Sequence, residues 1–138
     1  MRTPELVFPL SAQQATIISP VIEMSDVSKA TLLVSSAGTF LNRSGVVTAD
    51  VSMDGVTWVS FQMFAPNVTN TNAQNLTHVA ATTAIASTGQ QAAYGIEMIF
   101  PFRYIRFILT ATDGATPTGN FTLALYKAFI ETLSLIHI

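Results

Sequence analysis

The sequence predicts an all-β fold, an antiparallel β-sandwich of the jelly-roll kind with about seven or eight strands. Three observations lead to this prediction. Apolar residues recur mainly with a period of two, β-branched and aromatic residues concentrate in the same short runs, and turn-forming residues separate those runs. A chain of 138 residues has the size of one domain and can bury a sizeable core without a metal or a disulfide.

The predicted strands alternate between apolar and polar side chains. Residues 46–53 show this most clearly, because the pattern places Val47, Ala49, Val51 and Met53 on one face and Thr48, Asp50 and Ser52 on the other. Residues 77–91, rich in Ala and Thr, fit a strand followed by a loop, with a short helix as the open alternative. The other strand runs are residues 30–35, 57–64, 94–100, 104–110 and 120–126.

Turn residues indicate how the strands are connected. Asp54 and Gly55 lie between two alternating runs and predict a two-residue type I′ hairpin, in which both residues adopt positive φ. Both are therefore interpreted as structural turn residues. A longer loop, residues 113–119, is expected to join the last two core strands.

Both ends of the sequence differ in pattern from the middle. Residues 1–10 hold two prolines and predict an extended N-terminal arm, residues 11–127 predict the sandwich domain, and residues 128–138 predict an apolar C-terminal strand or arm. The last segment fits an edge strand of the same sandwich as well as it fits docking on a neighbour. Contacts with a partner or a second subunit are predicted for Leu6, Phe8, Phe129, Ile130, Leu133, Leu135, Ile136 and Ile138.

Low charge is the unusual feature of the composition. Only 10% of the residues are Asp, Glu, Lys or Arg, against about a quarter in typical domains. A surface of Thr, Ser, Asn, Ala and Val loses its water more easily than a charged one, and this favours lasting contacts with other subunits. Extracellular β-domains rich in Thr and Asn are the alternative source of such a composition.

The composition also excludes several classes of function. No cysteine is present, which excludes disulfide frameworks, Cys-ligated metals and thiol nucleophiles. The six cations are scattered and the net charge is −2, so nucleic-acid binding is not expected. No apolar stretch reaches the roughly 20 residues of a membrane span, and residues 1–10 do not resemble a signal peptide.

No combination of residues predicts an enzyme. The two histidines, His78 and His137, are far apart in sequence and predict neither a catalytic base nor a metal site. Asp50 is expected on the polar face of its strand and Asp54 in a turn, so they do not form a catalytic pair. Calcium binding by Asp50, Asp54 and Asp113 lacks a dense acidic loop. The sequence predicts no enzyme activity, no cofactor and no metal.

Two residues of the strand runs have predicted roles in packing. Trp58, the single tryptophan, is interpreted as part of the core or of a contact between subunits, with a sugar-binding face as the alternative. Arg106 lies within an apolar strand, so its guanidinium is expected to pair with a carboxylate or with backbone carbonyls.

Two segments resemble a recurring pattern of β-sandwich proteins. Residues 51–58 read Val-Ser-Met-Asp-Gly-Val-Thr-Trp, and residues 102–107 read Phe-Arg-Tyr-Ile-Arg-Phe. The pattern is similar to that of small structural proteins of tailed-phage virions and to that of discoidin-like carbohydrate-binding modules. The polar lead-in of residues 11–16 before the first strands also resembles the virion group. Discoidin-like modules usually join their ends by a disulfide, which this chain lacks.

The resemblance to virion proteins implies a function. It implies a capsid decoration, or cement, protein that binds and stabilises the major capsid shell as a homo-oligomer, with a trimer expected. It further implies a place in the virion after assembly in the bacterial cytoplasm. The alternatives are a tail, baseplate or head-fibre component, or a carbohydrate-binding module that recognises a host surface glycan.

Overall fold

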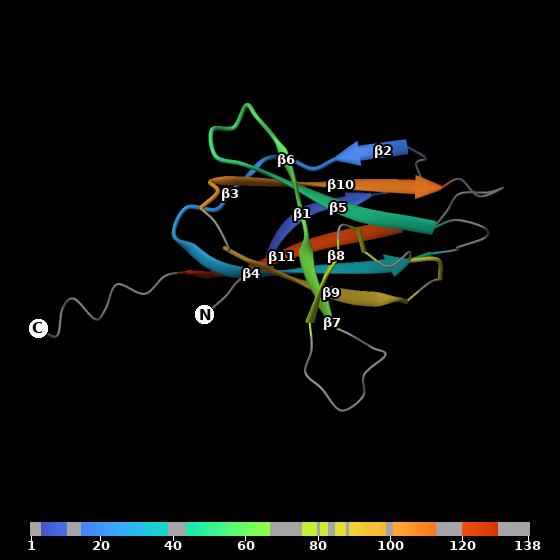
Figure 1. The fold of residues 1–138 in the computed structure, drawn as a ribbon. Coiled ribbons are helices and arrows are strands. Elements are labelled where there is room, and N and C mark those ends of the chain that lie inside the picture. Colours follow the sequence, from blue (N-terminus) through green and yellow to red (C-terminus); the bar gives the residue numbers. More distant parts are fainter. Residues whose placement is uncertain are drawn as a thin grey trace, which may run out of the picture.

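The protein is a two-layer β-sandwich (Figure 1). The computed structural model describes residues 4–10, 15–38, 44–66, 76–79, 81–82, 85–87, 89–98, 101–112 and 120–129. These residues form eleven strands and no helix, and every strand pairing is antiparallel. The predicted all-β sandwich is confirmed, with more strands than the seven or eight expected.

The larger sheet has six strands in the order β1-β11-β4-β9-β7-β8. Its long strands are β4 (Val27–Ala37) and β11 (Asn120–Phe129), which pair over most of their length. The remaining strands are β1 (Pro4–Leu10), β9 (Gln91–Glu97), β7 (Met63–Pro66) and β8 (Leu76–Val79).

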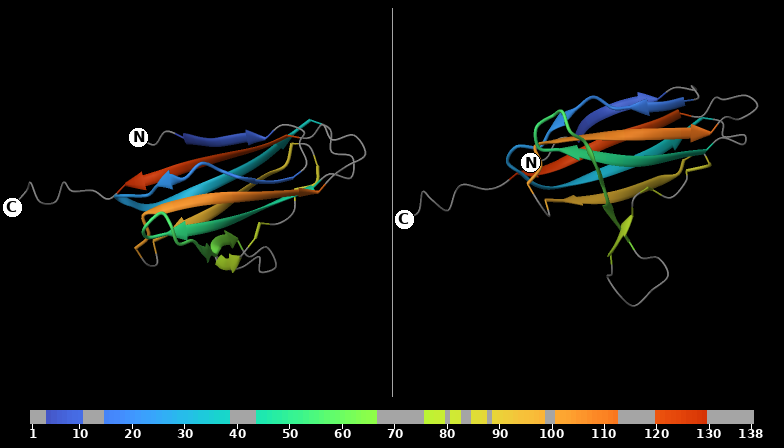
Figure 2. Two further views of the ribbon diagram at one scale, coloured as in Figure 1. Left: turned by 90° about the horizontal axis from the view of Figure 1, so that it is seen from above. Right: turned by 45° about the horizontal axis from the view of Figure 1, so that its top comes forward.

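The smaller sheet has five strands and lies above the first in Figure 1. Its order is β2-β10-β5-β6, and β3 also pairs with β10. The two long strands are β5 (Ser44–Ser52) and β10 (Tyr104–Thr112), and the short ones are β2 (Ala15–Ile18), β3 (Ile22–Glu23) and β6 (Val59–Phe61). Figure 2 shows the two layers from other sides.

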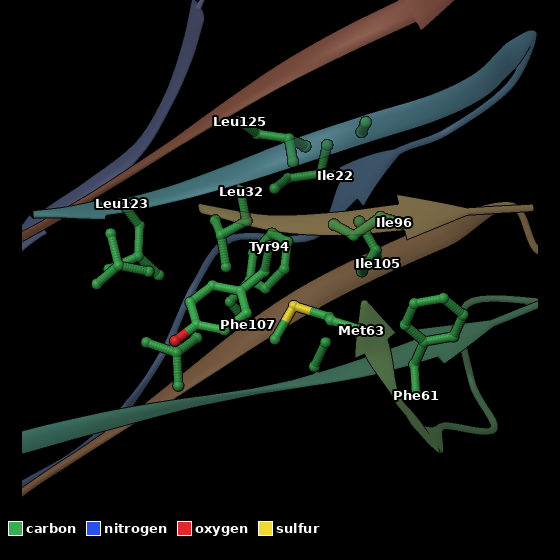
Figure 3. Packing of buried hydrophobic residues seen from close by; sticks show 14 of the residues in the cluster. Ile22, Leu32, Phe61, Met63, Tyr94, Ile96, Ile105, Phe107, Leu123 and Leu125 are labelled. Atoms are coloured by element: carbon green, nitrogen blue, oxygen red, sulfur yellow. The ribbon is translucent and has the colours of Figure 1, made fainter. Parts of the chain in front are cut away.

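The core follows directly from the alternation in the sequence. In β10 the inward residues Ile105, Phe107 and Leu109 are at most 1% exposed, while the residues between them face away from the core. Leu123 and Leu125 of β11 meet them from the other sheet, and both are fully buried. Figure 3 shows such side chains filling the space between the sheets.

A buried serine explains why β2 and β3 are separate strands. Pro20 has no backbone N–H, so the regular ladder along β10 cannot continue through it. The Ser19 hydroxyl instead accepts a hydrogen bond from the Phe107 backbone N–H at 2.8 Å and donates one to the Pro20 carbonyl at 2.9 Å. The edge therefore stays hydrogen-bonded where the chain departs from the strand.

The run 57–64 was predicted as one strand and forms two. Phe61 ends β6 in the small sheet, and Met63 begins β7 in the large sheet. Both side chains are buried and Gln62 between them is exposed, so the alternation continues while the chain changes sheets. The periodicity of side chains does not reveal such a crossing, because each half of the run satisfies it.

The N-terminal segment belongs to the sandwich. Residues 4–10 are extended, as expected, but they form β1 and pair with β11 of the same chain instead of leaving the domain as an arm. The register shifts between Leu6 and Phe8, and Pro4 and Pro9 limit further pairing at this edge. At the other end β11 continues to Phe129, two residues past the predicted domain boundary, and residues 130–138 lie outside the described residues.

Candidate functional site

The connection from β5 to β6, residues 53–58, is held by its own hydrogen bonds. The Asp54 carboxylate accepts bonds from the backbone N–H groups of Val56 at 2.8 Å and Thr57 at 2.9 Å, and from the Ser52 hydroxyl at 3.1 Å. The Ser52 hydroxyl in turn accepts a bond from the Gly55 N–H at 2.8 Å. These bonds, with that of Thr57 the strongest contributor, lower the pKa of Asp54 below its usual value.

The predicted two-residue type I′ hairpin is wrong. Gly55 has a φ of +80°, but among the described non-glycine residues only Asp26 has positive φ. The connection spans six residues because the Asp54 side chain, rather than its backbone conformation, closes the turn. Such a carboxylate-centred turn satisfies several backbone N–H groups and therefore defines a longer loop than Asp-Gly alone suggests.

The loop stands beside the outer face of the small sheet, where the pairing of the strands sets rows of neighbouring residues (Figure 1). One row is Arg106 opposite Asp50, and Asp50 is also opposite Ser60 of β6. Because Phe107 and Ala49 beside them point into the core, this row points outward.

Arg106 is the centre of this outer face. Its Nη2 atom donates to the Asp50 carboxylate at 3.4 Å, and its guanidinium lies 4.1 Å from the centre of the Trp58 ring. The predicted pairing of Arg106 with a carboxylate is confirmed. The side chains of Arg106 and Asp50 are only 26% and 19% exposed, so the pair is partly shielded from solvent and is stronger than a fully exposed one.

Trp58 does not belong to the core. It is half-buried and packs on Arg106 outside the sandwich, whereas Phe61, Tyr94 and Phe102 are buried inside. The alternation was read correctly, since Ser60 is exposed and Phe61 is buried, but the pattern alone does not tell which face of a strand meets the second sheet. The alternative prediction, contact with another subunit, concerns this same outer face.

Tyr104 extends the face toward the end of the sheet. A Cβ atom on Gly55 would lie 3.4 Å from the Tyr104 ring, so the loop rests against it. The Arg103 guanidinium lies 5.5 Å from the centre of that ring and 3.8 Å from Glu23. Both members of this ion pair are more than half exposed, so the pair adds little to stability.

Exposed aliphatic residues surround these groups. Val56 is 80% exposed at the loop, and Ile18 of β2 and Val21 before β3 are each more than half exposed. We call this surface the Trp58 face; its residues are Ile18, Val21, Asp50, Val56, Trp58, Tyr104 and Arg106. Tryptophan, tyrosine and arginine are the residues that most often dominate protein interfaces.

The predicted contact residues fall largely beyond what the structure describes. Leu6 and Phe8 lie in β1, but the orientation of their side chains is not described. Phe129 ends β11 and is 61% exposed. Ile130, Leu133, Leu135, Ile136 and Ile138 lie outside the described residues. The Trp58 face was missed, although Asp54, Trp58 and Arg106 were each singled out in the sequence.

The acidic residues and histidines considered for metal binding or catalysis do not form a metal-ligand group among the described residues. The described residues contain no group of three or more His, Asp or Glu side chains that could hold a metal ion. Asp50 and Asp54 have separate partners, and Asp113 and His137 lie outside the described residues. His78 lies in β8, opposite Phe64. No helix in the described part of the chain is long and apolar enough to cross a membrane.

Comparison with known proteins identifies the fold. No family model and no curated protein matches the sequence. The crystal structure of the SPBc2 prophage-derived protein YomS is similar, with a TM-score of 0.60 over 92% of each chain. The two sequences are only 9% identical, so the comparison shows that both proteins share one fold along nearly their whole length.

Proposed function

We propose that this chain is a structural protein of a phage virion, and specifically a capsid decoration protein that binds the major capsid protein as a homo-oligomer. The Trp58 face is the observation that carries the proposal. It gathers Trp58, Tyr104 and Arg106 with exposed aliphatic side chains on one side of a rigid sheet, which is the composition of a protein contact surface.

Two further findings support a virion role. The chain shares its fold, over 92% of each length, with a protein that a prophage encodes. Only 10% of its residues are charged, so little charge has to be desolvated when a neighbour covers the surface. A tail, baseplate or fibre component fits the same findings, and the capsid is preferred because of the sequence resemblance described above.

Glycan binding is the second candidate function. It is favoured by the position of Trp58, which lies outside the core beside Asp50 and Arg106. An aromatic ring next to paired polar groups can stack on a sugar and hydrogen-bond to its hydroxyl groups. The exposed Ile18 and Val56 at the same face fit a protein partner better than a sugar.

Cosedimentation with virion parts tests the proposal. The full chain is mixed with emptied or expanded capsids of its phage and, separately, with tails. We expect saturable binding to capsids, weakened at least tenfold by Trp58→Ala. The matched control is Gln91→Ala, which changes an exposed residue of the large sheet and should leave binding unchanged.

Three results would contradict the decoration role. Binding to tails alone would move the protein to the tail. Binding of glycans that Trp58→Ala abolishes in a folded protein, without any binding to capsids, would make it a carbohydrate-binding module. Capsid binding that Trp58→Ala leaves unchanged would exclude the Trp58 face as the contact surface.

A further inference from the structure

A groove lies at one end of the sandwich, between three segments of the chain. In Figure 1 these segments are at the left. These are the turn between β3 and β4, the end of β5, and the segment that leads into β10. The groove has a volume of about 810 Å³, and Met24 and Phe102, both nearly fully buried, form its floor. Its other lining residues are Ser25, Asp26, Val27, Ser28, Met53, Met98, Pro101 and Arg103.

The groove is apolar and adaptable. Three methionines line it, and methionine side chains adjust their shape to different partners more readily than branched ones. Its volume lies within the range of sites that hold several side chains or a small molecule. The groove therefore offers a place for apolar side chains of a binding partner.

Exposed apolar side chains stand around the same groove. Met53 lines it and is 54% exposed. Phe129 is 61% exposed and pairs with Val27, which also lines the groove. A surface that carries both a hollow and protruding apolar side chains has the two elements that a second copy of itself requires.

The charged residues of the groove are also complementary to a second copy of the same surface. Asp26 on the turn and Arg103 before β10 give it one anionic and one cationic side chain. Around a two-fold axis, any contact between two different residues occurs twice. A contact between Asp26 of one copy and Arg103 of the other therefore gives two ion pairs. The internal partner of Arg103, Glu23, is 3.8 Å away and more than half exposed, which leaves the guanidinium accessible.

We propose that two copies of this chain pair through this groove around a two-fold axis. Met53 and Phe129 of one copy contact the groove of the other, and Asp26 and Arg103 form reciprocal ion pairs. The pairing goes beyond the proposed virion function and does not depend on it, since it concerns the chain with itself. It also differs from the trimer that the sequence resemblance implies.

Light scattering coupled to size exclusion, across a dilution series of the full chain, tests the pairing. We expect the mass of a dimer that dissociates on dilution. Arg103→Asp and Asp26→Arg each place like charges together, and each should raise the dimer dissociation constant at least tenfold. Mixing these two variants restores both opposite-charge pairs, so the mixture should recover the dimer mass that neither variant forms alone.

Two controls separate pairing from effects on folding. Asp26 has a φ of 62°, where arginine is strained, so Asp26→Asn removes the charge in a residue type that tolerates this conformation. It should weaken the dimer several-fold while the thermal unfolding curve stays unchanged. Gln91→Arg adds a charge at the far end of β9, about 20 Å from Glu97 along the strand, and should not alter the mass.

The outcomes are decisive in both directions. Recovery of the dimer in the mixture supports the two-fold pairing. A monomer at every concentration, the mass of a trimer, an Asp26→Asn variant that dimerises like the native chain, or a monomeric mixture of two variants that both unfold cooperatively would each overturn it. None of these results depends on capsid binding, so the groove proposal and the decoration proposal can fail separately.

Discussion

The two outer faces of the sandwich differ in the size and chemistry of their side chains. On the large sheet, the pairing of β11, β4 and β9 places Ala124, Leu33 and Ala93 in one row. On the small sheet, the corresponding surface carries the Trp58 face. Both faces follow the same alternation of inward and outward residues. This row of the large sheet carries Ala and Leu side chains, whereas the central row of the small sheet carries Asp50 and Arg106, with the Trp58 ring stacked on the guanidinium.

A single connection produces much of this difference. Residues 53–58 bring Trp58 onto Arg106 and Gly55 onto Tyr104, so the small sheet gains a second layer of side chains. Low charge makes both faces easy to desolvate, and the Trp58 face adds an aromatic ring held on a guanidinium, which can anchor a partner. Low charge is therefore a property of the whole surface, whereas the aromatic contact surface depends on the loop of residues 53–58.

Among these variants, Gly55→Val is expected to change the free energy of unfolding most. Gly55 has a φ of +80° and lies against the Tyr104 ring, so a β-branched residue is strained there and should lower the free energy of unfolding by about 2–3 kcal/mol. The control on the large sheet is Gly95→Ala, whose Cβ would meet Phe64 at an ordinary 3.4 Å. Urea unfolding measures both; equal effects would mean that the loop conformation is not required.

Arg106→Ala should have the next largest effect. It leaves Asp50, which is 19% exposed, without its cation and removes the packing beneath Trp58, so we expect a loss of about 1–2 kcal/mol. Lys29→Ala, an exposed position on the large sheet, should stay within about 0.5 kcal/mol. Thermal unfolding of the two variants compares the faces directly. If Arg106→Ala does not change the stability, the contacts among Arg106, Asp50 and Trp58 do not stabilise the small sheet.

The sequence predicted what alternation and chemistry determine locally. The inward residues Val47, Ala49 and Val51 of β5 follow from the period of two. The prediction fails at the end of the run, where Met53 is 54% exposed and Ser52 is buried, because β5 ends at Ser52 and the loop begins. The ion pair of Arg106 follows from the need to pair a charge within an apolar strand. The change of sheet at Gln62 and the side of the sheet that Trp58 occupies depend on how the strands associate over long distances. No local pattern carries that information.

Lowering the pH should loosen the loop before the sheets. The pKa of Asp54 is lowered in the folded protein by its bonds to Thr57, Val56 and Ser52, so these bonds are intact at neutral pH and are lost as the pH falls through that lowered value. Trp58 is the only tryptophan, so its fluorescence reports on the loop. We expect the fluorescence to change below about pH 4, because the pKa of Asp54 lies below the ordinary pKa of a carboxyl group. The circular dichroism of the sheets should persist at that pH.

Asp54→Asn is the control for this titration. The amide keeps an oxygen that accepts the bonds of Val56 and Thr57 but does not titrate, so the variant should be nearly as stable as the native chain and lack the acid transition. An acid transition that persists in Asp54→Asn would assign the change to other carboxyl groups.

The smallest effect on stability and the most informative one on function is expected from Val56→Ser. Val56 is 80% exposed, so its replacement should change the free energy of unfolding by less than about 0.5 kcal/mol. If the Trp58 face contacts a partner, the same change removes an apolar group from a surface that becomes buried, and binding to capsids should weaken several-fold. Thr31→Ser on the large sheet, an exposed residue that loses one methyl group, should change neither quantity. Equal binding by both variants would show that the two outer faces do not differ in function, and the aromatic residues of the small sheet would then serve to stabilise the loop alone.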